Sequence, residues 1–189
     1  VGFLMSLEHP LFFLDYEAFA SAVPVVKGAR PHAQIPFQYS LHVLDAGGEL
    51  SHHEYLAEQL GMPEALLQAL SRDVGPAGSV ISWHKSYETA RNNEMATQFP
   101  IYARFLKDLN MRTVDLEDIF KASFVDIAFR GSTSIKTILP VLVPDMSYDD
   151  LAIADGTAAM EGWLEMVDVP AGKARDARRR ALLAYCAND

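Results

Sequence analysis

The hydrophobic pattern of the chain begins with a short continuous run, Leu11–Leu14, that leads directly into Asp15 and Glu17. A short run without polar positions is typical of a buried strand. Side chains alternate between the two faces of a strand, so Asp15 and Glu17 point the same way and Tyr16 points the opposite way. Two neighbouring anions repel each other, and a divalent metal ion with oxygen ligands is the cation that we expect between them.

The next segments predict an antiparallel meander. Residues 34–45 partly alternate between apolar and polar positions and are rich in aromatic and β-branched residues, which is typical of a strand. The sequence Asp45-Ala-Gly-Gly-Glu predicts a hairpin turn. Residues 50–55 are therefore expected to form a third strand that returns antiparallel to the second.

From residue 63 onward, helical and extended segments follow one another. Pro63 suits the first turn of a helix. A short apolar strand over residues 79–83 leads into a helix from Tyr87 to about Gln98, for which Ser86 is the predicted N-cap. Residues 112–120 have strand character before they turn helical. Helices are also expected from Pro100, from Ile135 to Val143, from Asp155 and from about Ala174. This order indicates an α/β domain.

Two further places in the chain carry acids of interest. Glu88 lies in the first turn of the helix that follows the apolar strand, where the helix dipole also favours an acid for purely structural reasons. Tyr185 and Asp189 are four residues apart in the last helix and so project from nearly the same face. There the carboxylate can bind a metal ion while the phenol orients a water molecule.

Composition narrows the class of protein. The 189 residues are half hydrophobic and carry a formal net charge of −9, which indicates one folded domain and argues against a general nucleic-acid binder, but not against an enzyme that binds the polymer locally. The single cysteine, Cys186, excludes an intramolecular disulfide and a cysteine-rich zinc module. No apolar stretch has the length of a membrane span, so we expect no membrane partner and a cytoplasmic location. The chain begins without Met, which suggests that residues 1–189 are one domain excised from a longer protein.

The order of these acids resembles the DEDD (DnaQ-like) superfamily of 3′–5′ exonucleases. The terminal motif of its tyrosine subgroup, Tyr-x-x-x-Asp, is matched by Tyr185 to Asp189. The middle motif resembles His84-Lys-Ser-Tyr-Glu88, in which His stands in place of Asn and Glu in place of Asp. The chain also resembles a branch catalogued as a domain of unknown function and often attached to RecB-like or Cas4-like nuclease domains. The resemblance implies a ribonuclease H-like fold, with a mixed five-stranded sheet (an antiparallel meander plus parallel strands) flanked by helices.

The resemblance also implies a reaction, the hydrolysis of phosphodiester bonds in DNA or RNA at single-stranded 3′ ends with two Mg²⁺ or Mn²⁺ ions. The implied metal ligands are Asp15, Glu17, Glu88 and Asp189. Tyr185 is expected to position the attacking water, and the backbone around Ala18 and Phe19 to cradle the terminal nucleotide. His84 either contacts the substrate phosphate, orients a water or bonds a loop carbonyl.

Two alternatives remain open at this point. Asp115, in the sequence Thr-Val-Asp-Leu, competes with Glu88 for the role of third acid, although the resemblance also allows a structural Asp at this point. The altered middle motif and the acidic net charge also agree with a nuclease-derived module that binds nucleic acid or a partner protein without cleaving it.

Overall fold

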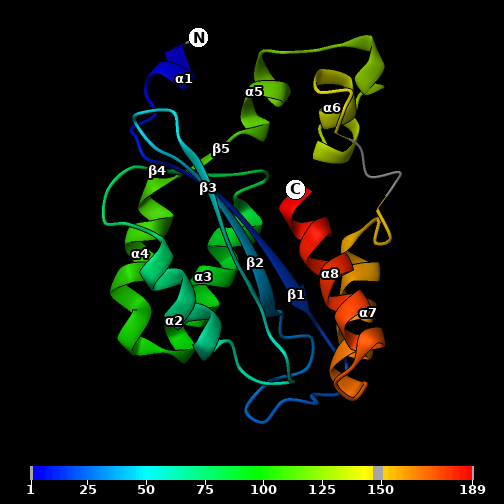
Figure 1. Cartoon of the computed structure of the whole chain (residues 1–189). Helices are drawn as coiled ribbons and strands as arrows, with labels where there is room; N and C mark the ends of the chain where they lie inside the picture. Colours follow the sequence, from blue (N-terminus) through cyan, green and yellow to red (C-terminus); the bar gives the residue numbers. More distant parts are fainter. Residues whose placement is uncertain (1, 147–150, 189) are drawn as a thin grey trace.

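The computed structural model describes residues 2–146 and 151–188. The protein is an α/β domain with a mixed five-stranded sheet flanked by helices, which confirms the expected fold class (Figure 1). The strands are β1 (Leu11–Phe19), β2 (Ile35–Leu44), β3 (Leu50–Leu56), β4 (Ser79–Ser82) and β5 (Thr113–Asp115). Their order across the sheet is β3-β2-β1-β4-β5, so the strand that carries Asp15 and Glu17 lies at the centre.

Helices precede, connect and follow the strands along the described part of the chain. They are α1 (Gly2–Met5), α2 (Glu64–Asp73), α3 (Ser86–Gln98), α4 (Ala103–Arg112), α5 (Glu117–Ala122), α6 (Ile135–Leu142), α7 (Gly156–Asp168) and α8 (Lys173–Asn188), with short 3₁₀ turns at Pro100–Tyr102 and Ile127–Phe129. In the described part of the chain, none of these helices combines the length and apolar character that crossing a bilayer requires.

The first three strands form the predicted antiparallel meander. β1 pairs antiparallel with β2, and β2 pairs antiparallel with β3. The hairpin between β2 and β3 is closed by Asp45, whose carboxylate oxygen Oδ1 accepts hydrogen bonds from the backbone N–H groups of Gly47 and Glu49 at 2.7 and 2.9 Å. Gly48 adopts φ +87°, a left-handed conformation that glycine adopts without strain. β4 and β5 then extend the sheet from β1 by parallel pairing.

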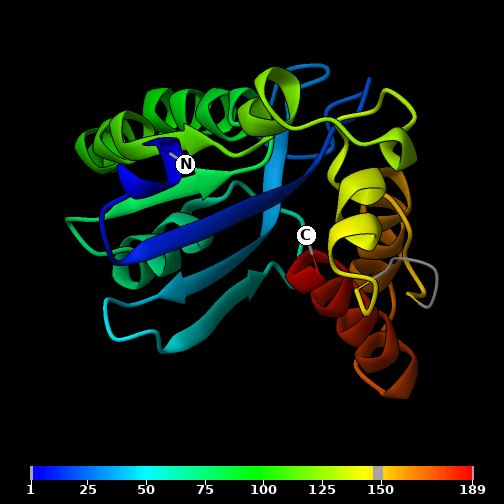
Figure 2. The same ribbon diagram turned by 90° about the horizontal axis from the view of Figure 1, so that it is seen from above.

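Helices cover both faces of the sheet. α2, α3 and α4 pack on the face to which Phe12, Leu14 and Tyr16 point, and these side chains form one buried apolar cluster. α7 and α8 pack on the other face, as the two perpendicular views show (Figures 1 and 2). There the ring of Trp163 stacks on Phe37 with 4.5 Å between centroids, and its indole N–H donates to the carbonyl oxygen of Ala57.

Candidate active site

Asp15 and Glu17 project from the central strand toward the face that α7 and α8 cover. Asp15 is half-buried, and Glu17 is buried. Glu17 lies beside the start of α7, since a Cβ atom added to Gly156 would lie 3.5 Å from its oxygen Oε2. Tyr16 points to the opposite face, where its hydroxyl donates to Oδ1 of Asn92 at 2.9 Å. The expected alternation along β1 is therefore confirmed.

The last turns of α8 lie against β1. The thiol of Cys186 donates to Oδ2 of Asp15 across 3.6 Å, although the two residues are 171 positions apart in sequence. The neighbouring Tyr185 is buried, and its hydroxyl accepts a hydrogen bond from the ammonium group of Lys136 at 2.8 Å. The same ammonium donates to the carbonyl oxygen of Ala154. Asp189, the predicted partner of Tyr185, lies outside the described residues.

Glu88 occupies the first turn of α3 and is almost fully buried, at 2% exposure. The pKa of Glu88 is raised to about 8, chiefly by burial and also by the negative charges of Asp115 and Glu17, while a backbone hydrogen bond and Arg91 oppose the shift. Its oxygen Oε2 has no hydrogen-bond partner among the described residues. The carboxyl group is therefore close enough to Glu17 to feel its charge, and it is mostly protonated at neutral pH.

Asp115 lies at the end of β5 and has a structural role. Its oxygen Oδ1 accepts from the backbone N–H groups of His84 and Glu117, and Oδ2 accepts from that of Lys85, at 3.0–3.1 Å. The expectation that Ser86 caps the helix was wrong, because α3 begins at Ser86 and has no capping side chain of its own. Asp115 caps this helix from a neighbouring strand. Since backbone amides occupy both of its oxygens, the geometry favours Glu88 as the third acid.

His84 belongs to a second polar network, which the sequence patterns did not reveal. Its ring nitrogen Nδ1 lies 2.9 Å from Oε2 of the buried Glu117, so its partner is a carboxylate and not a loop carbonyl. Burial alone would raise the pKa of Glu117, but hydrogen bonds from Lys121, Thr133 and His84 outweigh that effect and lower the pKa to about 2. Glu117 stands in the first turn of α5, where an acid reads as an ordinary helix start. No residue pattern around Glu117 in the sequence indicates that its carboxylate holds His84.

The strand β1 is irregular immediately after Glu17. The register with β2 shifts between Glu17 and Ala18, which is the signature of a bulge. The side chain of Phe19 is buried, with its ring centroid 5.1 Å from that of Trp163. Phe19 therefore belongs to the core, and the neighbouring Ala18 is partly exposed.

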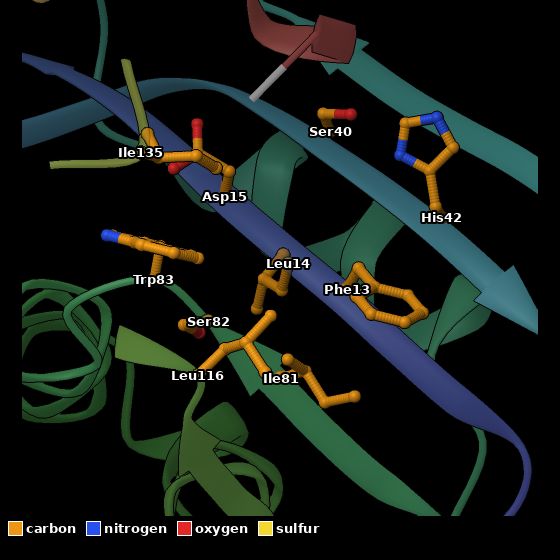
Figure 3. A pocket seen from close by; sticks show the side chains of 10 residues that line it. All are labelled: Phe13, Leu14, Asp15, Ser40, His42, Ile81, Ser82, Trp83, Leu116 and Ile135. Atoms are coloured by element: carbon orange, nitrogen blue, oxygen red, sulfur yellow. The ribbon is translucent and has the colours of Figure 1, made fainter. Parts of the chain in front are cut away.

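A cleft of about 140 Å³ opens beside Asp15 (Figure 3). Its lining comes from β1, β2, β4 and the segments that begin α5 and α6. The lining residues are Phe13, Leu14, Asp15, Ser40, His42, Ile81, Ser82, Trp83, Leu116 and Ile135. In Figure 3 Trp83 and Ile135 lie near Asp15, while His42 lies toward the other end of the cleft. One carboxylate of the candidate site thus faces an otherwise largely apolar hollow.

The described side chains do not complete a metal site by themselves. Within residues 2–146 and 151–188, no group of three or more His, Cys, Asp or Glu side chains is arranged to hold a metal ion. The donor chemistry nevertheless suits Mg²⁺ or Mn²⁺, because Asp15, Glu17 and Glu88 offer carboxylate oxygens. The orphaned oxygen of Glu88 and its repulsion from Glu17 are features that a bound cation relieves.

The chain matches one family of proteins and is similar to a much longer protein. Residues 12–134, more than half of the chain, match the family described as "Domain of unknown function (DUF2779)". The chain is also similar to the "Uncharacterized protein MG366 homolog" of Mycoplasma pneumoniae (strain ATCC 29342 / M129 / Subtype 1), with 28% identity over 177 residues, 82% of this chain and 26% of the relative. The chain thus spans about a quarter of that relative's length. No solved structure matches the chain significantly.

Proposed function

The chain belongs to the DUF2779 family, and we propose that it is a metal-dependent 3′–5′ exonuclease that shortens single-stranded DNA or RNA. One observation carries the proposal. Acids from β1 and from the first turn of α3, together with the last turns of α8, meet at the centre of the sheet although they are far apart in sequence. The fold gains nothing from burying the carboxyl group of Glu88 near the charge of Glu17, because ionising Glu88 there is costly and its oxygen Oε2 has no partner among the described residues.

In this proposal Asp15, Glu17, Glu88 and Asp189 hold two Mg²⁺ or Mn²⁺ ions, with Asp189 assigned from the motif alone. When bound, the ions polarise the phosphate and lower the pKa of a coordinated water. The residues of the chain supply the positioning. Glu88 gives up its proton as it becomes a ligand, since ligating carboxylates are ionised.

Tyr185 and Lys136 are assigned the orientation of the attacking water and of the phosphate. The ammonium group of Lys136 fixes the Tyr185 hydroxyl at 2.8 Å and lies 4.8 Å from the centroid of its ring. A hydroxyl held in this way has one defined orientation for a hydrogen bond to water, and the nearby positive charge favours a phosphate oxygen. The backbone at the bulge after Glu17 is the proposed contact for the terminal sugar.

The test is a degradation assay on 5′-labelled single-stranded DNA and RNA with Mg²⁺, Mn²⁺ or EDTA. We expect a metal-dependent ladder of products shortened from the 3′ end. The Asp15→Asn variant should lose this activity, whereas Glu49→Gln, the same kind of change at an exposed turn residue, should keep it. A ladder that persists in EDTA, or in Asp15→Asn, would refute the assignment.

A second function is favoured by the altered middle motif, in which the His84 position is tied to Glu117 and Glu88 replaces the expected Asp. In that case the domain binds nucleic acid or a partner protein without cleaving it. Retained binding of the labelled strands with no shortening under any metal would support this alternative over the exonuclease. In either case we propose a cytoplasmic protein in which a RecB-like or Cas4-like nuclease domain is the expected neighbour, in the same chain or in a complex.

A further inference from the structure

The cleft beside Asp15 is bounded by planar side chains that are held in place. The indole N–H of Trp83 donates to the carbonyl oxygen of Thr133 at 2.9 Å. The ring of His42 stacks on that of His52, with 4.2 Å between centroids and 19° between planes. Phe13, which is only half-buried, pairs with His42 across β1 and β2 and lies toward the same end of the cleft as His42 (Figure 3). Rigid, partly exposed rings of this kind lose little entropy when another flat group packs against them.

The polar groups of the cleft are neutral apart from Asp15. Burial lowers the pKa of His42, and the neighbouring His52 lowers it further, so the imidazole is uncharged at neutral pH and offers one donor and one acceptor. Ser82 is 3% exposed, and its hydroxyl has no hydrogen-bond partner among the described residues. Buried hydroxyl groups nearly always have a partner, so this one is suited to a ligand or an ordered water.

The charge and size of the cleft exclude two kinds of occupant. Among the described residues that line it there is no Lys or Arg, so the cleft itself offers no cationic side chain to a phosphate. Its volume of about 140 Å³ is well below the roughly 300–1,000 Å³ of pockets for drug-sized ligands. The kind of occupant that still suits the cleft is a single flat, neutral ring system with hydrogen-bonding edges.

We propose that this cleft binds one nucleobase of the substrate strand, adjacent to the phosphate at Asp15, with Phe13, Trp83 and His42 as its stacking surfaces. This rests on the proposed function for the position of the phosphate. Stacking on aromatic side chains is tolerant of sequence, because every base has a π-face. The cleft therefore strengthens binding and fixes the position of the strand along the site, without selecting one base over another.

The experiment measures binding without catalysis. Short single-stranded DNAs, each with one abasic site moved stepwise from the 3′ end, are titrated by fluorescence anisotropy in Ca²⁺ and in EDTA. For the wild type, an abasic site at one position should weaken binding by about five- to 150-fold, the equivalent of about 1–3 kcal/mol of base stacking. At other positions within the strand the loss should be smaller.

Two variants link that position to the cleft. Phe13→Leu keeps an apolar side chain but removes the aromatic face, and His42→Ala truncates the partly exposed ring at the other end of the cleft. In both, the penalty for the abasic site at the sensitive position should shrink by at least about twofold, as expected for groups in contact. His53→Ala changes a histidine beside Asp73 and serves as the matched control, so its penalty should equal that of the wild type.

The outcomes separate the two proposals. An equal penalty in the wild type and both variants, or no sensitive position, would overturn the base site even if the protein degrades DNA. A reduced penalty in a protein that never shortens the strand would sustain the base site and refute the exonuclease. Failure to bind any single strand would overturn both. Thermal melts show whether Phe13→Leu is folded, and His42→Ala tests the cleft at a second partly exposed position.

Discussion

Glu88 makes a sharp prediction about stability and pH in the metal-free protein. Its pKa is about 8 in the folded chain, against the ordinary value of 4.5 expected after unfolding. Between these values the unfolded chain loses the proton and the folded chain keeps it, so folding stability falls as pH rises from about 5 to about 8. A shift of roughly three and a half pH units at about 1.4 kcal/mol each gives an upper figure of about 5 kcal/mol.

The Glu88→Gln variant replaces the titratable carboxyl group with a neutral amide of nearly the same shape. We expect the wild type to lose stability relative to the variant as pH rises, by up to about 5 kcal/mol, or roughly 10–20 °C in Tm for a chain of this size. Urea unfolding in EDTA, followed by the fluorescence of Trp83 and Trp163 from pH 5 to 8.5, measures the difference.

The difference between the two proteins is the informative quantity, because other groups titrate as well. His42 has a lowered pKa in the folded chain, so it stabilises the fold as pH rises and acts in the opposite direction in part of this window. Glu117, with its pKa lowered to about 2, contributes a constant amount above pH 5. If the stability difference between wild type and Glu88→Gln does not change with pH, the account of a buried, protonated Glu88 is refuted.

Three further predictions follow from the contacts. Asp115→Ala leaves three backbone N–H groups without an acceptor and should lower the free energy of unfolding by roughly 2–4 kcal/mol in urea titrations; a loss no larger than that of the exposed Asp118→Ala, within about 0.5 kcal/mol, would contradict its capping role. Lys136→Met should slow nucleotide release on the order of 100-fold because the Tyr185 hydroxyl loses its donor, with partial rescue by Lys136→Arg, and unchanged single-turnover rates would exclude this role. Leu67→Ala, at a fully buried position, should cost about 2–5 kcal/mol, and a change in Tm too small to measure would refute its place in the core.

The parts of the fold that the sequence predicts are those set by neighbours along the chain. The alternation of Asp15, Tyr16 and Glu17 follows from strand geometry, and it was confirmed on β1. The hairpin at Asp45 depends on a side chain that bonds amides two and four residues later, so its signal is also local. The helix predicted from Tyr87 to about Gln98 is α3, which begins one residue earlier, at Ser86.

The parts of the site that escaped prediction depend on partners from other elements. Ser86 reads as a capping residue in sequence, but the cap comes from Asp115, which is brought to α3 by the pairing of β4 with β5. Glu117 reads as a helix start, and its bond to His84 spans 33 positions. Lys136 reaches Tyr185 across 49 positions. No residue pattern encodes these contacts, because they exist only after the elements have packed.

The contact between Cys186 and Asp15 also has a consequence for the order in which the protein is made. About 150 residues separate the end of β1 at Phe19 from the start of α8 at Lys173. At synthesis rates of about 5–20 residues per second, roughly 8–30 s pass between the two. During that interval the nascent meander presents Asp15 and Glu17 without the helix that packs beside them. A nascent chain is therefore unable to form the contact between Asp15 and Cys186 until α8 has emerged.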